Sequence, residues 1–309
     1  MTDTAVESPT LCFDVEVVRL QRLSPCFVRI TFGGARLDAF DGGGELGPRD
    51  QRIKVIVPSA GGSVAPIVDF SPGWYPRWLA LDPAVRGEMR TYTVRQVRHG
   101  GDAPQVDIDF VLHVAGDGTS GPAAAWASAA QLGDRVVLMG PRRGRCDDYG
   151  GIEWAPPAPH DGPLLLAGDE TAVPAVASIL ETLPSSYVGW AFLEVPAAVD
   201  FLQLHSDADV EVTWLARGHH PRGSRLASAV HEAAAPYARE PQDDVPDVDP
   251  DTMILWETPG GRQVAGTPYV WVAGEAAVVR ALRRHLVAEV GLPRANVAFM
   301  GYWREGRTL

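Results

Sequence analysis

The chain has 309 residues, of which 46% are hydrophobic and 21% charged, and its formal net charge at pH 7 is −12. This is the composition of a globular protein with material for two domains, which excludes a disordered chain, a disulfide-rich scaffold and a collagen-like repeat. The negative charge argues against nucleic acid as a partner, and the absence of any long apolar run argues against a membrane span.

The start of the chain and its cysteines indicate the compartment. The first residues, MTDTAVESPTL, lack the basic stretch followed by an apolar run that marks a signal peptide. Cys12, Cys26 and Cys146 are too few and too scattered for a disulfide framework, a zinc site or an iron–sulfur cluster. We therefore expect a cytoplasmic protein without a metal site, and we expect a monomer because nothing in the pattern indicates a coiled coil.

The first half of the chain, residues 1–150, is expected to form an antiparallel β-barrel. Runs rich in Val, Ile, Phe and Thr are separated by Gly, Pro and Asp at spacings typical of a barrel. One alanine-rich helix, Pro122–Gln131, interrupts them. The expected strands are Cys12–Leu20, Phe27–Phe32, Ile53–Val57, Arg90–Val97, Gln105–Leu112 and Arg135–Met139.

The hydrophobic period changes in the second half, residues 151–309, after a stretch rich in Pro and Gly at 150–162. Strand and helix patterns alternate there, which predicts an α/β domain with a parallel sheet. The expected strands are Pro163–Ala167, Gly189–Val195, Val210–Leu215, Tyr269–Val272 and Asn296–Trp303, and the expected helices are Thr171–Leu183 and Ala276–Val290.

An acidic segment interrupts this second domain. Residues 231–251 hold seven acidic residues against one arginine, a net charge of −6, together with four prolines. We expect a solvated insertion, because such a composition buries little apolar surface.

The segment RTYTVR, residues 90–95, has the residue types that a flavin dinucleotide requires. On a strand, Arg90, Tyr92 and Val94 share one face. Tyr92 offers an aromatic plane for the isoalloxazine ring, Arg90 offers a fixed cation for phosphate, and Thr93 offers a hydroxyl. A barrel strand rich in Arg and Thr without any ligand is the alternative.

The segment DGTSGP, residues 117–122, leads directly into the alanine-rich helix. Thr119 or Ser120 can cap the helix, Gly121 allows close backbone approach, and Pro122 suits the first turn. The exposed N–H groups and the helix dipole then form an anion site, which favours a pyrophosphate.

Several segments resemble the siderophore-interacting protein family, and GDETAVPA and GYWREG carry most of the specificity. The resemblance implies a ferredoxin-reductase-like fold, in which an FAD-binding barrel precedes a nicotinamide-nucleotide-binding α/β domain. The segments are RTYTVR (90–95), DFVLH (109–113), GPAAAWA (121–127), GDRVVLMGPRRG (133–144), AGDETAVPA (167–175), VAGEAAVVRALRRHL (272–286) and GYWREG (301–306).

The resemblance implies an FAD-dependent reductase of ferric siderophores that takes electrons from NADPH or NADH. No protein residue acts as a catalytic acid, base or nucleophile in such a reaction, because electrons pass through the flavin. Ala124 stands where the family often has a small hydroxyl residue. The residues that the resemblance assigns to the cofactors are Arg90, Tyr92, Thr93, His113, Thr119, Ser120, Gly121, Pro122, Ala123, Ala124, Trp126, Asp169, Glu170, Thr171, Ala172 and Trp303.

The nicotinamide site is unusual for a dinucleotide. Asp169 and Glu170 place carboxylates at the start of a helix, where pyrophosphate would be expected, so they cap the helix or hold ribose hydroxyls. The loop Arg217–Arg225 either reads a 2′-phosphate, meets an anionic siderophore or is a solvated surface. The residues assigned to NAD(P)H are Arg217, Arg222, Gly274 and Glu275.

The remaining assignments concern the substrate. An anionic ferric siderophore needs a locally positive surface on this acidic chain, and the candidates are Lys54, Arg142, Arg143 and Arg217. Trp303 covers a flavin face or packs between domains. Two other functions stay open: a reductase whose acceptor is a protein, which predicts a broad basic face, and a binding module without turnover.

Overall fold

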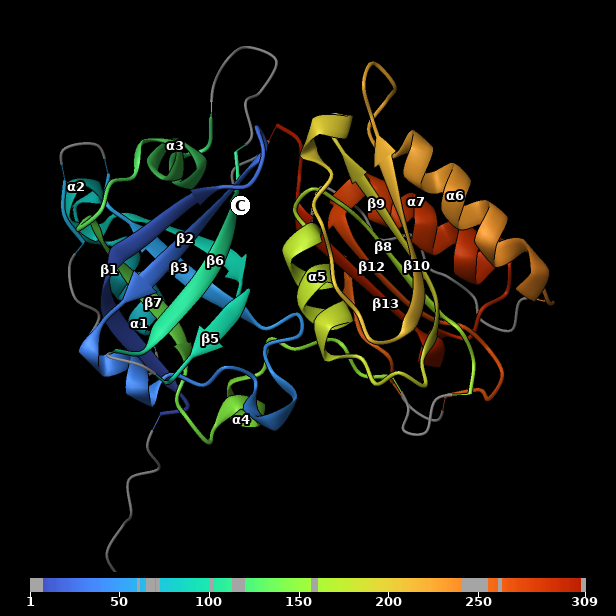
Figure 1. Cartoon of the computed structure of the whole chain (residues 1–309), viewed down its shortest axis with the longest axis horizontal. Helices are drawn as coiled ribbons and strands as arrows, with labels where there is room; N and C mark the ends of the chain where they lie inside the picture. Colours follow the sequence, from blue (N-terminus) through green and yellow to red (C-terminus); the bar gives the residue numbers. More distant parts are fainter. Residues whose placement is uncertain are drawn as a thin grey trace, which may run out of the picture. The chain divides into compact units, whose positions relative to one another are not determined.

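A computed structural model describes residues 8–59, 62–64, 70, 73–100, 103–112, 120–156, 161–240, 255–260 and 263–306. The chain divides into two compact units, Met1–Ile152 and Glu153–Leu309 (Figure 1). The first is an antiparallel barrel and the second has a largely parallel sheet with helices, which confirms the expected fold class. No helix in the described ranges is long and apolar enough to cross a membrane.

The first unit is built on one antiparallel sheet of seven strands. Their order across the sheet is β4-β3-β7-β1-β2-β6-β5. The strands are β1 (Thr10–Arg22), β2 (Phe27–Gly33), β3 (Arg52–Val57), β4 (Glu88–Thr93), β5 (Gln96–Arg98), β6 (Gln105–Val111) and β7 (Arg135–Pro141).

The strand expected over residues 90–97 is divided into two strands, β4 and β5. Strands β4 and β5 follow each other in sequence but lie at opposite edges of the sheet. The two residues between them bond to opposite sides of the sheet, since the N–H of Val94 donates to the carbonyl of Gln51, directly before β3, and that of Arg95 to the carbonyl of Asp107 on β6, each at 2.9 Å. Arg95 also forms a 3.7 Å ion pair with the buried Asp109. The single strand expected over residues 90–97 is therefore wrong, because the chain turns from one edge to the other.

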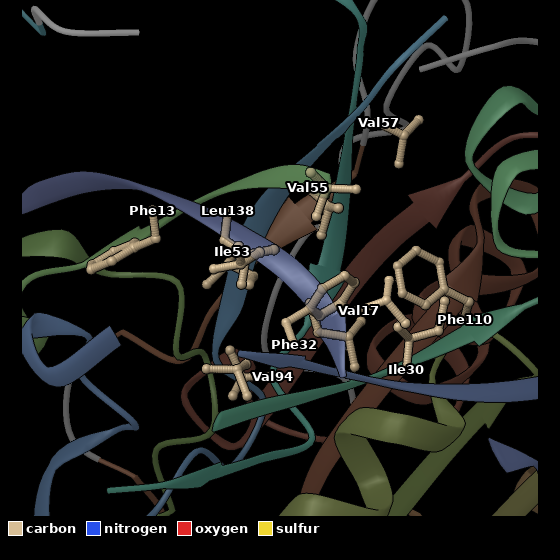
Figure 2. Packing of buried hydrophobic residues seen from close by; sticks show 14 of the residues in the cluster. Phe13, Val17, Ile30, Phe32, Ile53, Val55, Val57, Val94, Phe110 and Leu138 are labelled. Carbon is tan, nitrogen blue, oxygen red and sulfur yellow. The ribbon is translucent and has the colours of Figure 1, made fainter. Parts of the chain in front are cut away.

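The barrel interior is filled by the inward residues of these strands. Phe13, Ile30, Phe32, Val55 and Phe110 are at most 1% exposed and belong to one cluster (Figure 2). Burial of a cluster of this size is the main stabilising contribution of the unit.

The expectation of a single helix in the first half was wrong. Among the described residues of this unit there are four α-helices and two 3₁₀-helices, most of them a single turn next to Gly or Pro, which the periodicity of the sequence does not reveal. They are η1 (Ala35–Ala39), η2 (Gly44–Leu46), α1 (Trp74–Leu79), α2 (Pro83–Arg86), α3 (Pro122–Ala129) and α4 (Cys146–Tyr149).

The second unit contains a six-stranded sheet in the order β10-β9-β8-β12-β13-β11. Five neighbouring strands are parallel and the short edge strand β11 is antiparallel to β13, so the sheet is mixed rather than wholly parallel. The strands are β8 (Leu164–Asp169), β9 (Val188–Val195), β10 (Asp209–Ala216), β11 (Trp256–Glu257), β12 (Tyr269–Glu275) and β13 (Val297–Trp303).

Helices cover both faces of this sheet (Figure 1). Helices α6 and α7 pack on one face through Leu226, Val230 and Leu282, and α5 lies on the other. The helices are α5 (Val173–Thr182), α6 (Ser224–Ala234), α7 (Ala276–Arg283), the π-helix η5 (Arg284–Glu289) and the 3₁₀-helices η3 (Ala198–Asp200), η4 (Ala235–Tyr237) and η6 (Arg294–Asn296).

Helix α6 corrects the expected insertion at 231–251. Residues 231–234 form the last turn of α6 and Ala234 is 1% exposed. The acidic composition of the segment obscured the end of this helix, whose buried apolar residues recur every four positions, at Leu226, Val230 and Ala234. Residues 241–254 lie outside the described residues.

The strand order places a switch point between β8 and β12. From β8 the chain proceeds to β9 and β10 on one side, and then returns to β12 and β13 on the other. In open α/β sheets, ligands bind beyond the carboxyl ends of the strands at such a point.

Candidate functional site

Strand β4 carries the side chains that the sequence assigns to a flavin. Arg90 donates through Nη1 to the carbonyl of Met89 at 2.7 Å and to Oε2 of Glu88 at 3.3 Å. The half-buried ring of Tyr92 packs against the barrel core. Burial raises the pKa of the Tyr92 hydroxyl, so it stays neutral at physiological pH. Thr93 is buried.

A row of aromatic rings joins β4 to helix α3. The ring centre of Tyr92 lies 4.4 Å from that of Phe110 on β6, which lies 5.8 Å from that of Trp126 on α3. Phe32 stacks on Trp126 with ring centres 6.4 Å apart, and Figure 2 shows Phe32 and Phe110 within the core. Two segments that the sequence assigns to one flavin are therefore neighbours in the barrel.

The first turn of α3 is open to an anion. Gly121 is the N-cap and Pro122 the first helical residue, and no side chain in the described part of the chain caps this end. Ala123 and Ala124 are buried against the barrel, whereas Ser120 is exposed. A β-carbon on Gly121 would meet no described atom within 4 Å. The N–H groups at this end are thus available to phosphate oxygens, which fits the pyrophosphate of FAD.

The siderophore candidates of the first unit make different contacts. Lys54 on β3 donates through Nζ to the hydroxyl of Thr91 on β4 at 2.6 Å, and burial lowers the pKa of its ammonium group. Arg142 follows β7 and donates through Nε to the carbonyl of Ser8 at 3.1 Å. Two further residues assigned to the flavin lie outside the described residues: His113 and Thr119.

A small hollow of about 10 Å³, room for about one water molecule, lies at the switch point of the second unit. It is bordered by the last residues of β8 and β12 and by the first turns of α6 and α7. Polar and glycine residues line it at these strand and helix ends: Asp169, Arg222, Gly223, Gly274 and Glu275. Its position, beyond the carboxyl ends of parallel strands at the switch point, is the one at which ligands bind in open α/β sheets.

Asp169, the last residue of β8, is saturated with hydrogen bonds. Its Oδ1 accepts from the backbone N–H and the hydroxyl of Thr171 at 2.9 and 2.5 Å. Its Oδ2 accepts from the N–H of Glu275 and from Nε1 of Trp303, both at 2.8 Å. Burial raises the pKa of this carboxyl to about 6. Gly274 has φ of +148°, and a β-carbon there would lie 2.8 Å from the Asp169 carboxyl carbon, so this approach requires glycine.

Glu170 is fully buried and holds two arginines. Its oxygens lie 3.0 Å from Nη1 of Arg217 and 2.8 Å from Nη1 of Arg222, whose side chains are 12% and 23% exposed. The guanidinium carbon of Arg222 also lies 4.6 Å from the ring centre of Trp303, a cation–π geometry. These two arginines are therefore not part of a solvated surface, although His219 and His220 between them are exposed.

Buried glutamates cap the N-termini of α6 and α7. Glu194 accepts from the N–H groups of Gly223 and Leu226 at 2.8 and 3.2 Å. Glu275 accepts through Oε2 from two N–H groups in the first turn of α7 at 2.7 and 3.1 Å. Helix α5 differs, because no side chain caps its first turn among the described residues and Asp169 accepts from Thr171, which precedes the N-cap Ala172. At α6 and α7, carboxylates of the chain thus take the helix positions that phosphates take in dinucleotide sites.

Sequence reasoning did not find Glu194. A signal was present, because a single acidic residue stands near the end of the apolar run GWAFLEV. An ionised carboxylate in a buried strand needs a partner inside the protein, and the partners are the first turn of α6 and Arg217, at 3.6 Å.

Comparison with known proteins agrees with this arrangement. A family model described as siderophore-interacting FAD-binding domain matches residues 16–145. A second model, described as siderophore-interacting protein, matches residues 163–306. The fold and the two matches define a two-domain protein whose barrel is an FAD-binding domain. The chain belongs to the siderophore-interacting protein family, as the sequence motifs indicated.

Relatives and solved structures span nearly the whole chain. Ferric vibriobactin reductase ViuB of Vibrio cholerae is 29% identical, covering 95% of this chain and 89% of its own. The NADPH-dependent ferric-chelate reductase of Escherichia coli is 27% identical, covering 94% and 92%. A siderophore utilization protein from T. fusca superposes with a TM-score of 0.67 at 28% identity, covering 97% and 95%. A ferredoxin reductase, at 14% identity, 96% and 70% coverage and a TM-score of 0.56, shares the fold.

Proposed function

We propose that this protein is an FAD-dependent reductase of ferric siderophores that takes its electrons from NAD(P)H and releases Fe(II) for assimilation. The observation that carries the proposal is the uncapped first turn of α3, held beside Tyr92 by an aromatic row within a family FAD-binding domain. The names of two relatives, a ferric vibriobactin reductase and an NADPH-dependent ferric-chelate reductase, support the substrate and the donor.

FAD is held in this proposal by β4 and by the start of α3. Tyr92 packs along the isoalloxazine ring, Thr93 meets its polar edge, and Arg90 pairs with a phosphate. The first-turn N–H groups of α3, from Ala123 onward, bind the pyrophosphate. The chemistry that bound FAD supplies is acceptance of hydride from a nicotinamide and one-electron transfer to Fe(III). The residues themselves bind, orient and exclude water.

The substrate binds through basic side chains in this proposal. Lys54 and Arg142 of the first unit offset part of the negative charge of a ferric siderophore on a chain whose net charge is −12, whereas Arg217 is already bonded to the buried Glu170. Protein ligands to iron are unnecessary because the siderophore already surrounds the metal with hard oxygen donors. Those donors hold Fe(II) less tightly than Fe(III), so reduction releases the iron.

The donor binds at the switch point in this proposal, beyond the carboxyl ends of β8 and β12. We also propose that the protein acts in the cytoplasm, where NAD(P)H is available, and that it acts as a monomer because each chain carries both an FAD-binding and a nucleotide-binding domain.

The test is iron reduction by the FAD-loaded protein under anaerobic conditions. Ferric complexes of a tris-catecholate and of a tris-hydroxamate are supplied with NADPH or NADH, and Fe(II) is trapped by ferrozine. We expect the ferrozine complex to form only when protein, FAD and a nicotinamide donor are all present. Binding of the ferric complex without any Fe(II), with either donor, would instead identify a binding module without turnover.

A further inference from the structure

We propose that Glu275 is a specificity-determining residue that opposes a diphosphate at the hollow of the second unit, so that a nicotinamide dinucleotide is held there without the usual pyrophosphate contact at a helix N-terminus. The inference rests on the proposed function only for the identity of the donor. The position of the Glu275 carboxylate, where a ligand phosphate would otherwise bind, does not depend on whether the protein reduces iron.

The first observation is the position of the Glu275 carboxylate. It caps α7 through Oε2, at 2.7 and 3.1 Å from two backbone nitrogens. It borders the hollow and is only 5% exposed. Its other oxygen, Oε1, lies 3.4 Å from the N–H of Glu305 in the turn that follows β13. The carboxylate is therefore fixed at the helix end rather than free to swing away from an incoming anion.

The second observation is the charge around the same hollow. Four buried carboxylates meet at this edge of the sheet, namely those of Asp169, Glu170, Glu194 and Glu275. Two guanidinium groups face them, those of Arg217 and Arg222, and both are bonded to Glu170. A phosphate that entered would compete with Glu170 for its cations and would meet the charge of Glu275 at short range, where like charges repel strongly.

The third observation excludes α6 as the alternative anion site. Its first-turn N–H groups, from Gly223 and Leu226, are bonded to both oxygens of Glu194 at 2.8 and 3.2 Å. Glu194 is completely buried. The N-termini of α6 and α7, which border the hollow, are thus both bonded to carboxylates of the chain, so a phosphate could reach either helix end only by displacing a carboxylate.

The proposal is tested by direct binding to the full-length, FAD-loaded protein with the substitution Glu275→Gln. Glutamine keeps a side-chain oxygen that accepts from the first turn of α7 but removes the negative charge. Dissociation constants for ADP and NADP⁺ are measured by calorimetry. We expect both ligands to bind about fivefold more tightly or better, the size of a charge effect at a helix end.

Glu211→Gln is the matched control, because it makes the same charge change at an exposed position of β10. Its constants should equal those of the unchanged protein. If Glu275→Gln binds ADP no more tightly than this control, the proposal is overturned.

A measurement on the unchanged protein covers the case in which Glu275→Gln does not fold. Adenosine and ADP are compared as ligands, and we expect the diphosphate to add no affinity. Tenfold tighter binding of ADP than of adenosine would overturn the inference. Failure of the reductase proposal is distinguishable, because it would leave these binding constants unchanged and abolish only the formation of the ferrozine complex.

Discussion

The N-terminus of α3 in the first unit differs from those of α6 and α7 in the second unit in whether a carboxylate of the chain already caps it. In the barrel, the first turn of α3 has no side-chain cap among the described residues, and a β-carbon at Gly121 would meet open space. In the second unit, the first turns of α6 and α7 are capped by Glu194 and Glu275. A helix N-terminus offers the same N–H groups and dipole in each case. Whether it receives a ligand depends on which acidic residues the fold has already placed there.

The same contrast holds for arginines. Arg90 of the barrel bonds to one carbonyl and to one partly exposed glutamate, at 2.7 and 3.3 Å. Arg217 and Arg222 of the second unit are bonded to a carboxylate that water does not reach. We therefore expect a charge removed from the second unit to reduce stability, and a charge removed from the barrel site to reduce ligand binding.

The largest effect is expected for Glu170→Gln. This change leaves two partly buried guanidinium groups without their carboxylate, which lowers the free energy of unfolding by about 3 kcal/mol. Chemical denaturation monitored by circular dichroism measures the loss. Glu211→Gln, exposed on β10, is the control and should lie within about 0.5 kcal/mol of the unchanged protein. A stable Glu170→Gln protein would show that these arginines are not held by Glu170 and would remove the contrast.

The next effect is expected for Arg90→Ala, with the opposite consequence. We expect FAD affinity to fall about tenfold or more, as for loss of a charge-assisted hydrogen bond, while the unfolding free energy of the apoprotein changes little. Flavin content after gel filtration and titration with FAD measure this. Arg19→Ala, on the exposed face of β1, should retain FAD. Stoichiometric flavin in the Arg90→Ala protein would mean that β4 does not hold the phosphate.

A further effect, spread over about two pH units, is a pH dependence of stability that arises from Asp169. Burial raises the pKa of the Asp169 carboxyl to about 6 in the folded protein, above the ordinary aspartate value of 3.8. The Asp169 contribution to the free energy of unfolding therefore falls by about 3 kcal/mol as the pH rises between these two values, and it is constant above them. Unfolding curves of the unchanged protein and of Asp169→Asn from pH 4 to 7 measure it. Parallel pH profiles for the two proteins would contradict the raised pKa.

Much of the fold was readable from local pattern. Apolar alternation located the barrel strands of the first half, and the change of period at 150–162 located the change of architecture. The alanine-rich run after Gly121 predicted α3 to within two residues of its observed end. The two errors have different causes: the break after Thr93 depends on the closing of the sheet, which no short window of sequence contains, whereas the end of α6 was missed because the acidic composition was weighed above the apolar period of Leu226, Val230 and Ala234.

Some residues of the candidate site could likewise be predicted from the sequence, whereas the partners of others could not. Residue type and spacing were enough to select Arg90, Tyr92 and the turn before Pro122, since a flavin needs a cation, an aromatic plane and a free helix end close together in one unit. The partners of Asp169 and Glu170 could not be read from sequence, because they come from loops and helices far along the chain.

By itself, the sequence determined the order of barrel and α/β domain, the family, and the residue types available to a flavin, because these follow from periodicity and from short motifs. Only the tertiary structure decided which charged side chains are already paired within the protein. Glu194, Glu275 and Glu170 are far apart in the chain, and it is the parallel packing of β8, β9 and β12 that brings them to one edge. There, burial makes an unsatisfied charge so costly that each carboxylate is bound by the protein's own donors.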